Sequence, residues 1–289
     1  MDELLDEARK RDRVGRRIKV LVLVKTTPTP SDQYEDTVCV AGLALEPGPV
    51  RWVRLYPIPF RHLDASSKFQ KYSIINVGVG RPRNDPRAES LRVDVGTITV
   101  TRVLEPWVDR CRVLNPVPST TACELNAAAA ADPNATSLGI VRPLQVGLEV
   151  KPHRGWSERQ QAVLRKWRNQ AALPIDGLPH RDAPPLEHPP LEAWYRYTCE
   201  APECRGHRQG ILDWELTSLQ RKARADGVDV EERVRRNFFQ NMFAPDRSQW
   251  FILGNNAEAA KRTSFSVLSI LWPRTKDVRR ADALNSTLF

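Results

Sequence analysis

The sequence contains no apolar run long enough to cross a membrane. A spanning helix needs about 20 mostly apolar residues, whereas the apolar runs here have the length of strands, as in IKVLVLVK at 18–25. The first residues, MDELLDEARKRDRVGRR, are acidic and then basic and lack the apolar core of a secretory signal. We therefore expect a cytoplasmic protein with no membrane partner and a short N-terminal helix or arm over 1–17.

Glycine is scarce, at 14 of 289 residues, and the common catalytic and phosphate-binding signatures are absent. There is no GxGxxG after a strand, no GxxxxGK[ST], no GxSxG and no HExxH. The sequence therefore names no reaction. It favours a binding protein over an enzyme, and if the protein is an enzyme we expect a hydrolase that acts on nucleic acid.

Cysteines are few, odd in number and scattered along the chain. They are Cys39, Cys111, Cys123, Cys199 and Cys204. This pattern does not suit a disulfide framework, and in a reducing compartment clustered cysteines more often bind a metal.

Basic residues are in clear excess. The 44 Lys and Arg residues outnumber the 35 Asp and Glu residues, which gives a formal net charge of +9 and a pI near 9.6. A basic domain commonly binds nucleic acid, DNA or RNA. Two alternatives stay open: an arginine-rich genome that raises arginine everywhere, and a protein–protein adaptor whose charge is incidental.

Residues 18–105 contain five strand-like segments separated by Gly, Pro, Asn and Asp clusters, with no convincing helix between them. This predicts a mainly antiparallel barrel of OB-like or PUA-like type, which we expect to extend over 18–155. We assign 156–193 to a basic helix, capped by Ser157 with Gln160 three residues on, and a connector rich in proline. The remainder, 194–289, reads as a smaller α+β domain, so the predicted fold class is α+β.

One segment of the barrel, VRWVRLYPI at 50–58, alternates aromatic and basic side chains. On a strand, Trp52, Arg54 and Tyr56 share one face, where they could stack on bases and hold phosphates. The alternative is that Trp52 and Tyr56 belong to the core while Arg54 caps the barrel edge. The predicted nucleic-acid-binding residues are Arg51, Trp52, Arg54, Tyr56, Arg61, Lys68, Lys71, Arg81 and Arg83.

The segment YTCEAPECRGHRQGILDWEL at 197–216 combines metal-ligand types in a short space. Cys199, Cys204 and His207 follow the spacing C-x4-C-x2-H, and a knuckle of this kind can bring two thiolates and an imidazole to one zinc ion. A structural zinc site normally has four ligands, and the fourth is not evident. The candidates are His188 above all, then His180, Cys39, Cys111, Cys123, Glu203 and Asp213. The alternatives are two reduced cysteines without a metal, or a catalytic zinc with water in the fourth position.

Asp213 and Glu215 allow a different chemistry. On a strand, D-x-E would place both carboxylates on one face, where they could hold a metal ion for phosphodiester hydrolysis. On a helix, Asp213 would be the N-cap and Glu215 would lie in the first turn, and the helical pattern that begins here favours this interpretation.

The sequence thus predicts a nucleic-acid-binding protein with a structural zinc ion, with protein partners if it belongs to a DNA-processing or defence assembly. The alternative function is a metal-dependent nuclease or phosphodiesterase that uses Asp213 and Glu215.

Overall fold

The computed structural model describes residues 15–32, 35–82, 85–169 and 184–286. The predicted N-terminal helix and most of the proline-rich connector lie outside these residues. The chain forms two compact units, one drawn from Met1–Leu23, Pro28–Val103 and Trp156–Glu187, the other from Val24–Thr27, Leu104–Gly155 and His188–Phe289. Residues 104–155, which the sequence analysis assigned to the barrel, therefore group with the C-terminal half of the chain.

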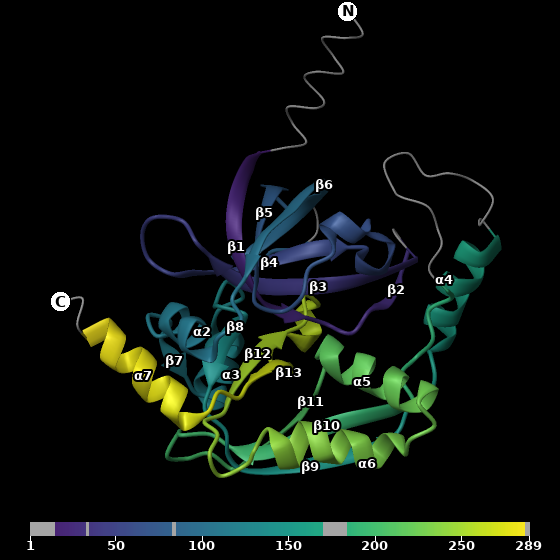
Figure 1. Ribbon diagram of the computed structural model, residues 1–289. Helices are drawn as coiled ribbons and strands as arrows, with labels where there is room; N and C mark the ends of the chain where they lie inside the picture. Colours follow the sequence, from purple (N-terminus) through teal and green to yellow (C-terminus); the bar gives the residue numbers. More distant parts are fainter. Residues whose placement is uncertain (1–14, 33–34, 83–84, 170–183, 287–289) are drawn as a thin grey trace, which may run out of the picture. The chain divides into compact units, whose positions relative to one another are not determined.

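The first unit is built around a barrel (Figure 1). Its strands are β1 (Arg16–Lys25), β2 (Thr29–Ser31), β3 (Glu35–Ala44), β4 (Arg51–Ile58), β5 (Ser73–Gly80) and β6 (Ser90–Val103). Two single turns, η1 (Phe60–His62) and η2 (Ala65–Ser67), follow β4, and α4 (Glu158–Asn169) completes the unit.

Five strands close the barrel, as the count of strand-like segments predicts. They pair in the order β1-β5-β6-β4-β3, and β3 returns to β1. The β4–β6 pair is parallel, whereas β1–β5, β5–β6 and β3–β4 are antiparallel. Closure brings two backbones together at Gly42, where a Cβ atom would lie 2.0 Å from the carbonyl oxygen of Leu21. Only glycine permits that approach.

Alternating side chains from these strands fill the barrel interior. Val20, Val40, Val53 and Leu55 are almost completely buried. Beside the barrel, α4 begins with the predicted capping box, in which the Gln160 amide donates to Ser157 Oγ at 3.3 Å and the Ser157 amide donates to Gln160 Oε1 at 3.0 Å. The helix is fixed to β2 by the Trp167 indole, which donates to the Ser31 carbonyl at 2.8 Å.

The second unit contains two sheets and most of the helices. One sheet has the order β11-β10-β9 and the other β13-β12-β8-β7. The strands are β7 (Ser119–Thr120), β8 (Leu138–Val141), β9 (Leu144–Pro152), β10 (Leu191–Thr198), β11 (His207–Gly210), β12 (Trp250–Asn255) and β13 (Phe265–Leu271). The helices are α2 (Trp107–Leu114), α3 (Ala122–Ala131), α5 (Trp214–Ala225), α6 (Val230–Arg235), its continuation η3 (Arg236–Asn241), the turn η4 (Ala259–Lys261) and α7 (Thr275–Ser286).

An aromatic core joins these elements. The Tyr195 ring stacks on Phe251 at a centroid distance of 4.8 Å, and Tyr197 meets the same ring edge-on at 5.1 Å. Cys199 belongs to this buried cluster, and Cys123 and Cys204 pack against it. The core therefore supports the segments that carry the cysteines. Within the part of the chain that the structure describes, no helix has the length and apolar character that a membrane crossing requires.

Candidate metal centre and nucleic-acid interface

The turn between β10 and β11 carries three of the predicted metal ligands. β10 ends at Thr198, next to Cys199, and β11 begins at His207. Inside the turn, the Cys204 amide donates to the Ala201 carbonyl at 3.1 Å, and the Cys199 amide donates to Cys204 Sγ at 3.3 Å. Gly206 has a φ of +96°, a left-handed conformation that side-chain-bearing residues rarely adopt, so glycine is required for the chain to turn back toward His207.

A fourth ligand comes from the first turn of α3. Cys123 is the second residue of this helix, whose N-cap is Thr121. The Thr121 side chain and Glu124 form a capping box, with hydrogen bonds of 3.1 and 2.8 Å. Leu125 is buried in the core and holds the helix in place. The helix N-terminus favours a thiolate, because its free N–H groups and its dipole attract negative charge.

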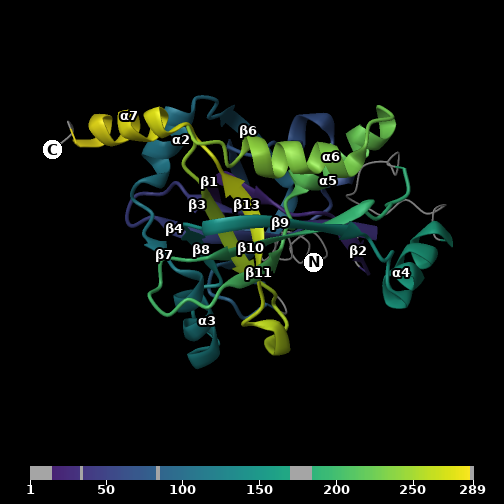
Figure 2. The same ribbon diagram turned by 90° about the horizontal axis from the view of Figure 1, so that it is seen from below.

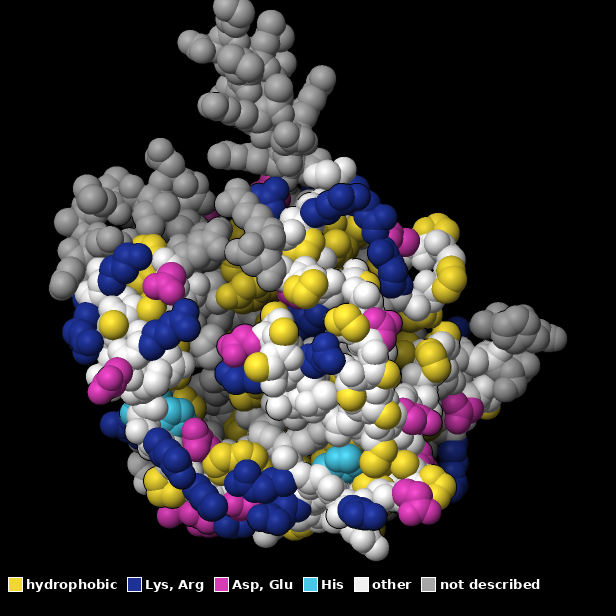
Figure 3. Space-filling model, turned by 180° about the vertical axis from the view of Figure 1, so that it is seen from behind, with side chains coloured by type: hydrophobic (Ala, Val, Ile, Leu, Met, Phe, Trp, Pro, Cys, Tyr) yellow, Lys and Arg dark blue, Asp and Glu magenta, His cyan; other side chains and the backbone are white. Residues whose placement is uncertain are grey.

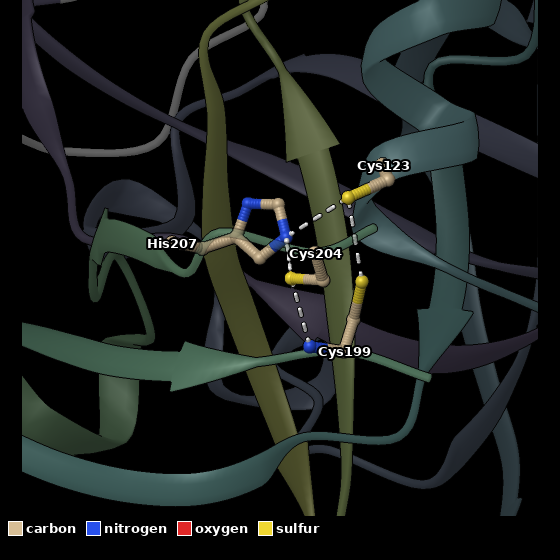
Figure 4. A group of neighbouring side chains, drawn as sticks. All are labelled: Cys123, Cys199, Cys204 and His207. Carbon is tan, nitrogen blue, oxygen red and sulfur yellow. Dashed lines mark hydrogen bonds between the residues drawn. The ribbon is translucent and has the colours of Figure 1, made fainter. Parts of the chain in front are cut away.

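The four side chains converge on one point (Figure 4). Cys199 Sγ lies 3.6 Å from Cys123 Sγ, and His207 Nε2 lies 3.3 Å from Cys204 Sγ and 3.6 Å from Cys123 Sγ. Four ligand atoms that surround a zinc ion tetrahedrally, at about 2.0 to 2.3 Å, are roughly 3.4 to 3.8 Å from one another. Since all four ligand atoms lie within 4.8 Å of one another, the cluster could bind a metal ion.

The thiols of this cluster do not share their protons equally. Burial opposes a charge on the Cys199 sulfur, but hydrogen bonds from the backbone amides of Ala201 and Cys123 outweigh it and lower its pKa to about 6. Burial, together with the neighbouring sulfurs of Cys199 and Cys204, raises the pKa of Cys123 to about 12. Without a cation the second and third negative charges are therefore costly, and a bound divalent ion would remove that cost and deprotonate the remaining thiols.

The structure brings Cys199, Cys204 and His207 together, as their spacing predicts, and adds Cys123 from among the suggested fourth ligands. His188, the leading candidate, does not join them. Its ring stacks on His153 at a centroid distance of 4.7 Å. His180 lies outside the described residues. The only local signal for Cys123 is its place after Thr121, in the first turn of a helix with a T-x-x-E capping box.

Asp213 and Glu215 do not form a pair on a strand. Asp213 is the N-cap of α5, and its side chain accepts a hydrogen bond of 3.0 Å from the Glu215 amide. The helical interpretation is confirmed, and the strand geometry that the nuclease alternative needs is wrong. Neither residue belongs to a group of three or more metal-ligand side chains among the described residues. At the other end of α5, Gly227 has a φ of +68°, as expected for the predicted C-cap.

The predicted nucleic-acid-binding residues of the barrel occupy different environments. Tyr56 is 45% exposed, whereas Arg54 is 3% exposed. Trp52 and Arg61 are half-buried and Lys71 is buried. The exposed basic side chains are Arg51, Lys68 and Arg81, and Arg83 lies outside the described residues. On the face seen in Figure 3, Lys and Arg side chains form several separate groups with acidic side chains among them.

Arg54 contacts Cys39 from beneath this surface, with Nη1 donating to Cys39 Sγ at 3.8 Å. Burial lowers the pKa of Arg54, and the nearby positive charge of Arg87 acts in the same direction. Arg87 is fixed by Asp85, which accepts from its Nε at 2.8 Å and its Nη2 at 2.6 Å. Two guanidinium groups therefore lie close together at this end of the barrel and create a local positive potential.

Comparison with family models divides the chain close to the same place as the structure does. Residues 118–288 match the domain of unknown function DUF8757, and this match covers more than half of the chain. The chain belongs to the DUF8757 family. Residues 16–116 match a second domain of unknown function, DUF8758. The DUF8757 part contains all four residues of the metal cluster, and the DUF8758 part contains the barrel strands.

No curated protein matches the chain. Among solved structures, a chain from a replication protein A heterotrimer bound to ssDNA is similar, with 9% identity and a TM-score of 0.36, over 94% of this chain and 51% of that chain. This member of the DUF8757 family thus spans about half the length of that chain. A murine DNA binding protein bound with ds DNA is similar over 90% of this chain and 96% of that one, with 8% identity and a TM-score of 0.30.

Proposed function

We propose that this protein binds nucleic acid and that the Cys123 cluster holds a structural zinc ion. The observation that carries the proposal is the order of the barrel strands. Numbered along the chain, β1, β3, β4, β5 and β6 close in the order first, second, third, fifth, fourth, with a parallel third–fifth pair. This is the Greek-key arrangement of OB folds, which bind oligonucleotides on the face of their second and third strands.

The side chains on that face support the proposal. The third strand is β4, which carries Tyr56 at 45% exposure and the half-buried Trp52. An exposed aromatic ring can stack on a base of any sequence, and basic side chains near it can hold the phosphates. Arg51 precedes Trp52 on the same strand, and Arg81 follows the fourth strand, β5. Arg54, which is buried, supports the surface from beneath.

The composition of the metal cluster supports a structural role for the ion. Three cysteines and one histidine supply four protein ligands, which fills a tetrahedral zinc site and leaves no position for a water molecule. The ligands join the β10–β11 turn to α3, two segments that are far apart in the sequence. We therefore infer that zinc fixes the fold of this unit and takes no part in a reaction.

Fluorescence anisotropy with labelled single-stranded and duplex oligonucleotides tests the proposed binding. Tyr56→Ala should weaken binding by about fivefold or more, since stacking of one base contributes about 1 to 3 kcal/mol. Arg81→Gln should weaken binding and lower the dependence on salt by about one counterion. The control is Arg235→Gln, which removes an equal charge from α6 at a residue that is already paired with Glu231.

Loss of affinity in Tyr56→Ala and Arg81→Gln, with the control near wild type, would support the barrel face as the binding surface. Equal losses in all three variants would mean that net charge alone drives binding and would overturn the proposed surface. Absence of binding by the wild-type protein would overturn the proposed function itself.

A further inference from the structure

The outer face of the sheet β11-β10-β9 carries an aromatic and basic group that the barrel proposal does not use. Along β10, Ala193, Tyr195 and Tyr197 point into the core, so Trp194 and Arg196 point to the opposite face. Figure 2 looks onto these three strands, which lie in front of β12 and β13. The side chain of Arg196 is 65% exposed. This face is therefore open in the unit that contains it.

Strand register assembles the group from all three strands. On β11, Arg208 pairs with Arg196, and on β9, Glu149 pairs with Trp194. The Arg208 guanidinium lies 4.3 Å from the centre of the Trp194 ring. Gly210 and Gly147 face Trp194 and Arg196 across the sheet. Since neither glycine has a side chain, nothing stands up from the strands beside these two residues.

Positive charge exceeds negative charge on this face. Glu149 accepts from Arg208 at two distances of 2.9 Å and from Arg196 at 3.0 Å, and it contacts Lys151 Nζ at 2.8 Å. Three cations thus share one carboxylate. Hydrogen bonds from Arg208 and Lys151 hold the pKa of Glu149 well below its ordinary value. A second anion, such as a phosphate, would find two unbalanced positive charges here.

We propose that this face binds a single strand of nucleic acid, with a base on Trp194 and phosphate groups between Arg196, Arg208 and Lys151. The inference rests on the proposed function and adds a second contact surface to it. A single strand is the occupant that fits, because the bases of a duplex stack on each other and cannot stack on an indole. A flat sheet with an aromatic platform is a recurrent way of binding unpaired bases.

The metal cluster lies at the end of this surface. The turn that joins β10 to β11 is the segment with Cys199, Cys204 and His207. A bound ion would fix the turn and with it the register that sets Arg208 beside Trp194. The platform and the metal site thus share one hairpin.

Affinity measurements with the full-length, zinc-loaded protein test the inference. The probes are labelled oligothymidylate and oligouridylate of about 16 nucleotides, the upper end of the sites that OB domains occupy, and a duplex of equal length. Trp194→Ala should weaken single-strand binding by about fivefold or more, and Trp194→Phe should retain most of it. Neither change should weaken duplex binding as much.

Glu149→Gln provides a test that a loss of folding cannot imitate. Removal of this carboxylate leaves Arg196, Arg208 and Lys151 without their shared anion, so single-strand affinity should rise by about two- to tenfold at low salt and the rise should shrink as salt increases. The matched control is Glu231→Gln on α6, which removes the same charge and leaves Arg235 unpaired. It should change affinity far less than Glu149→Gln.

The inference and the proposed function fail in different ways. If Tyr56→Ala weakens binding but the Trp194 and Glu149 variants bind like wild type, the platform is overturned and the barrel proposal stands. Equal gains in Glu149→Gln and Glu231→Gln would overturn it too, because net charge would explain both. If the wild-type protein binds none of the probes, the proposed function fails as well.

Discussion

At the scale of single residues, Asp213 shows how a side chain with the chemistry of an active site can have a structural role. Its carboxylate is 2% exposed and caps α5. Asp213→Ala should destabilise the protein by about 1 kcal/mol, because the helix loses an N-cap. Asp213→Asn should cost less, since asparagine caps equally well. Urea unfolding of the two variants measures the difference, and an unchanged midpoint for Asp213→Ala would contradict the capping role.

Gly206 offers a second prediction at this scale. At a φ of +96°, an alanine would be strained, so Gly206→Ala should destabilise the protein by about 1 to 2 kcal/mol and weaken metal binding. Gly147→Ala is the control, because a Cβ atom there has no neighbour within 4 Å. Thermal unfolding with and without added zinc compares the two variants. A loss in Gly147→Ala as large as that in Gly206→Ala would show that the backbone angle at Gly206 is not the cause.

Arg54 marks the limit of residue-by-residue prediction. The alternation of a strand correctly indicates that Trp52, Arg54 and Tyr56 share a face, but it does not indicate how much of that face is covered. Tyr56 is exposed and Arg54 is buried, although they are two residues apart. The difference arises because distant segments cover one part of the strand, including the pairing of Arg54 with Ser90 on β6. A local pattern contains no information on such contacts.

At the scale of secondary-structure elements, the metal cluster divides into a part that could be predicted and a part that could not. Cys199, Cys204 and His207 lie within nine residues, so the geometry of one turn brings them together. Cys123 is 76 residues away from Cys199, and only the tertiary packing of α3 brings it near. Spacing rules apply to ligands on one turn, and a ligand from another element has to be identified in three dimensions.

Metal analysis of purified protein tests the cluster. We expect about one zinc ion per chain in the wild-type protein, a large loss in Cys123→Ser and wild-type content in Cys39→Ser, a cysteine outside the cluster. Loss of the ion should lower the melting temperature, because zinc binding contributes directly to folding. Zinc-free wild-type protein with an unchanged melting temperature would contradict a structural metal site.

Acidification should release the ion. Protons compete with zinc for the three sulfurs and for His207 Nε2, so occupancy should fall as the pH falls. A zinc-sensitive dye can follow the release during a titration from neutral to acidic pH. Retention of full occupancy in strong acid, where all four ligands would be protonated, would argue that other residues hold the metal.

At the scale of the whole molecule, the chain interleaves its two units. The barrel takes α4 from beyond residue 155, and the second unit takes residues 24–27 from the end of β1. The five strand-like segments and their turns could be read from the sequence, whereas the closure of β3 onto β1 depends on pairing between segments far apart in the chain. The placement of 104–155 in the second unit has the same cause, since β8 pairs with β12 more than a hundred residues later.

The central claim is that this basic protein binds nucleic acid through phosphate contacts, and the salt dependence of binding tests it most directly. A protein that neutralises several phosphates releases counterions, so its affinity should fall by orders of magnitude between about 50 and 200 mM salt. We predict a steep linear decrease of log affinity with log salt for the wild-type protein, and a shallower decrease for Arg81→Gln. A flat profile, or no binding at low salt, would contradict the claim.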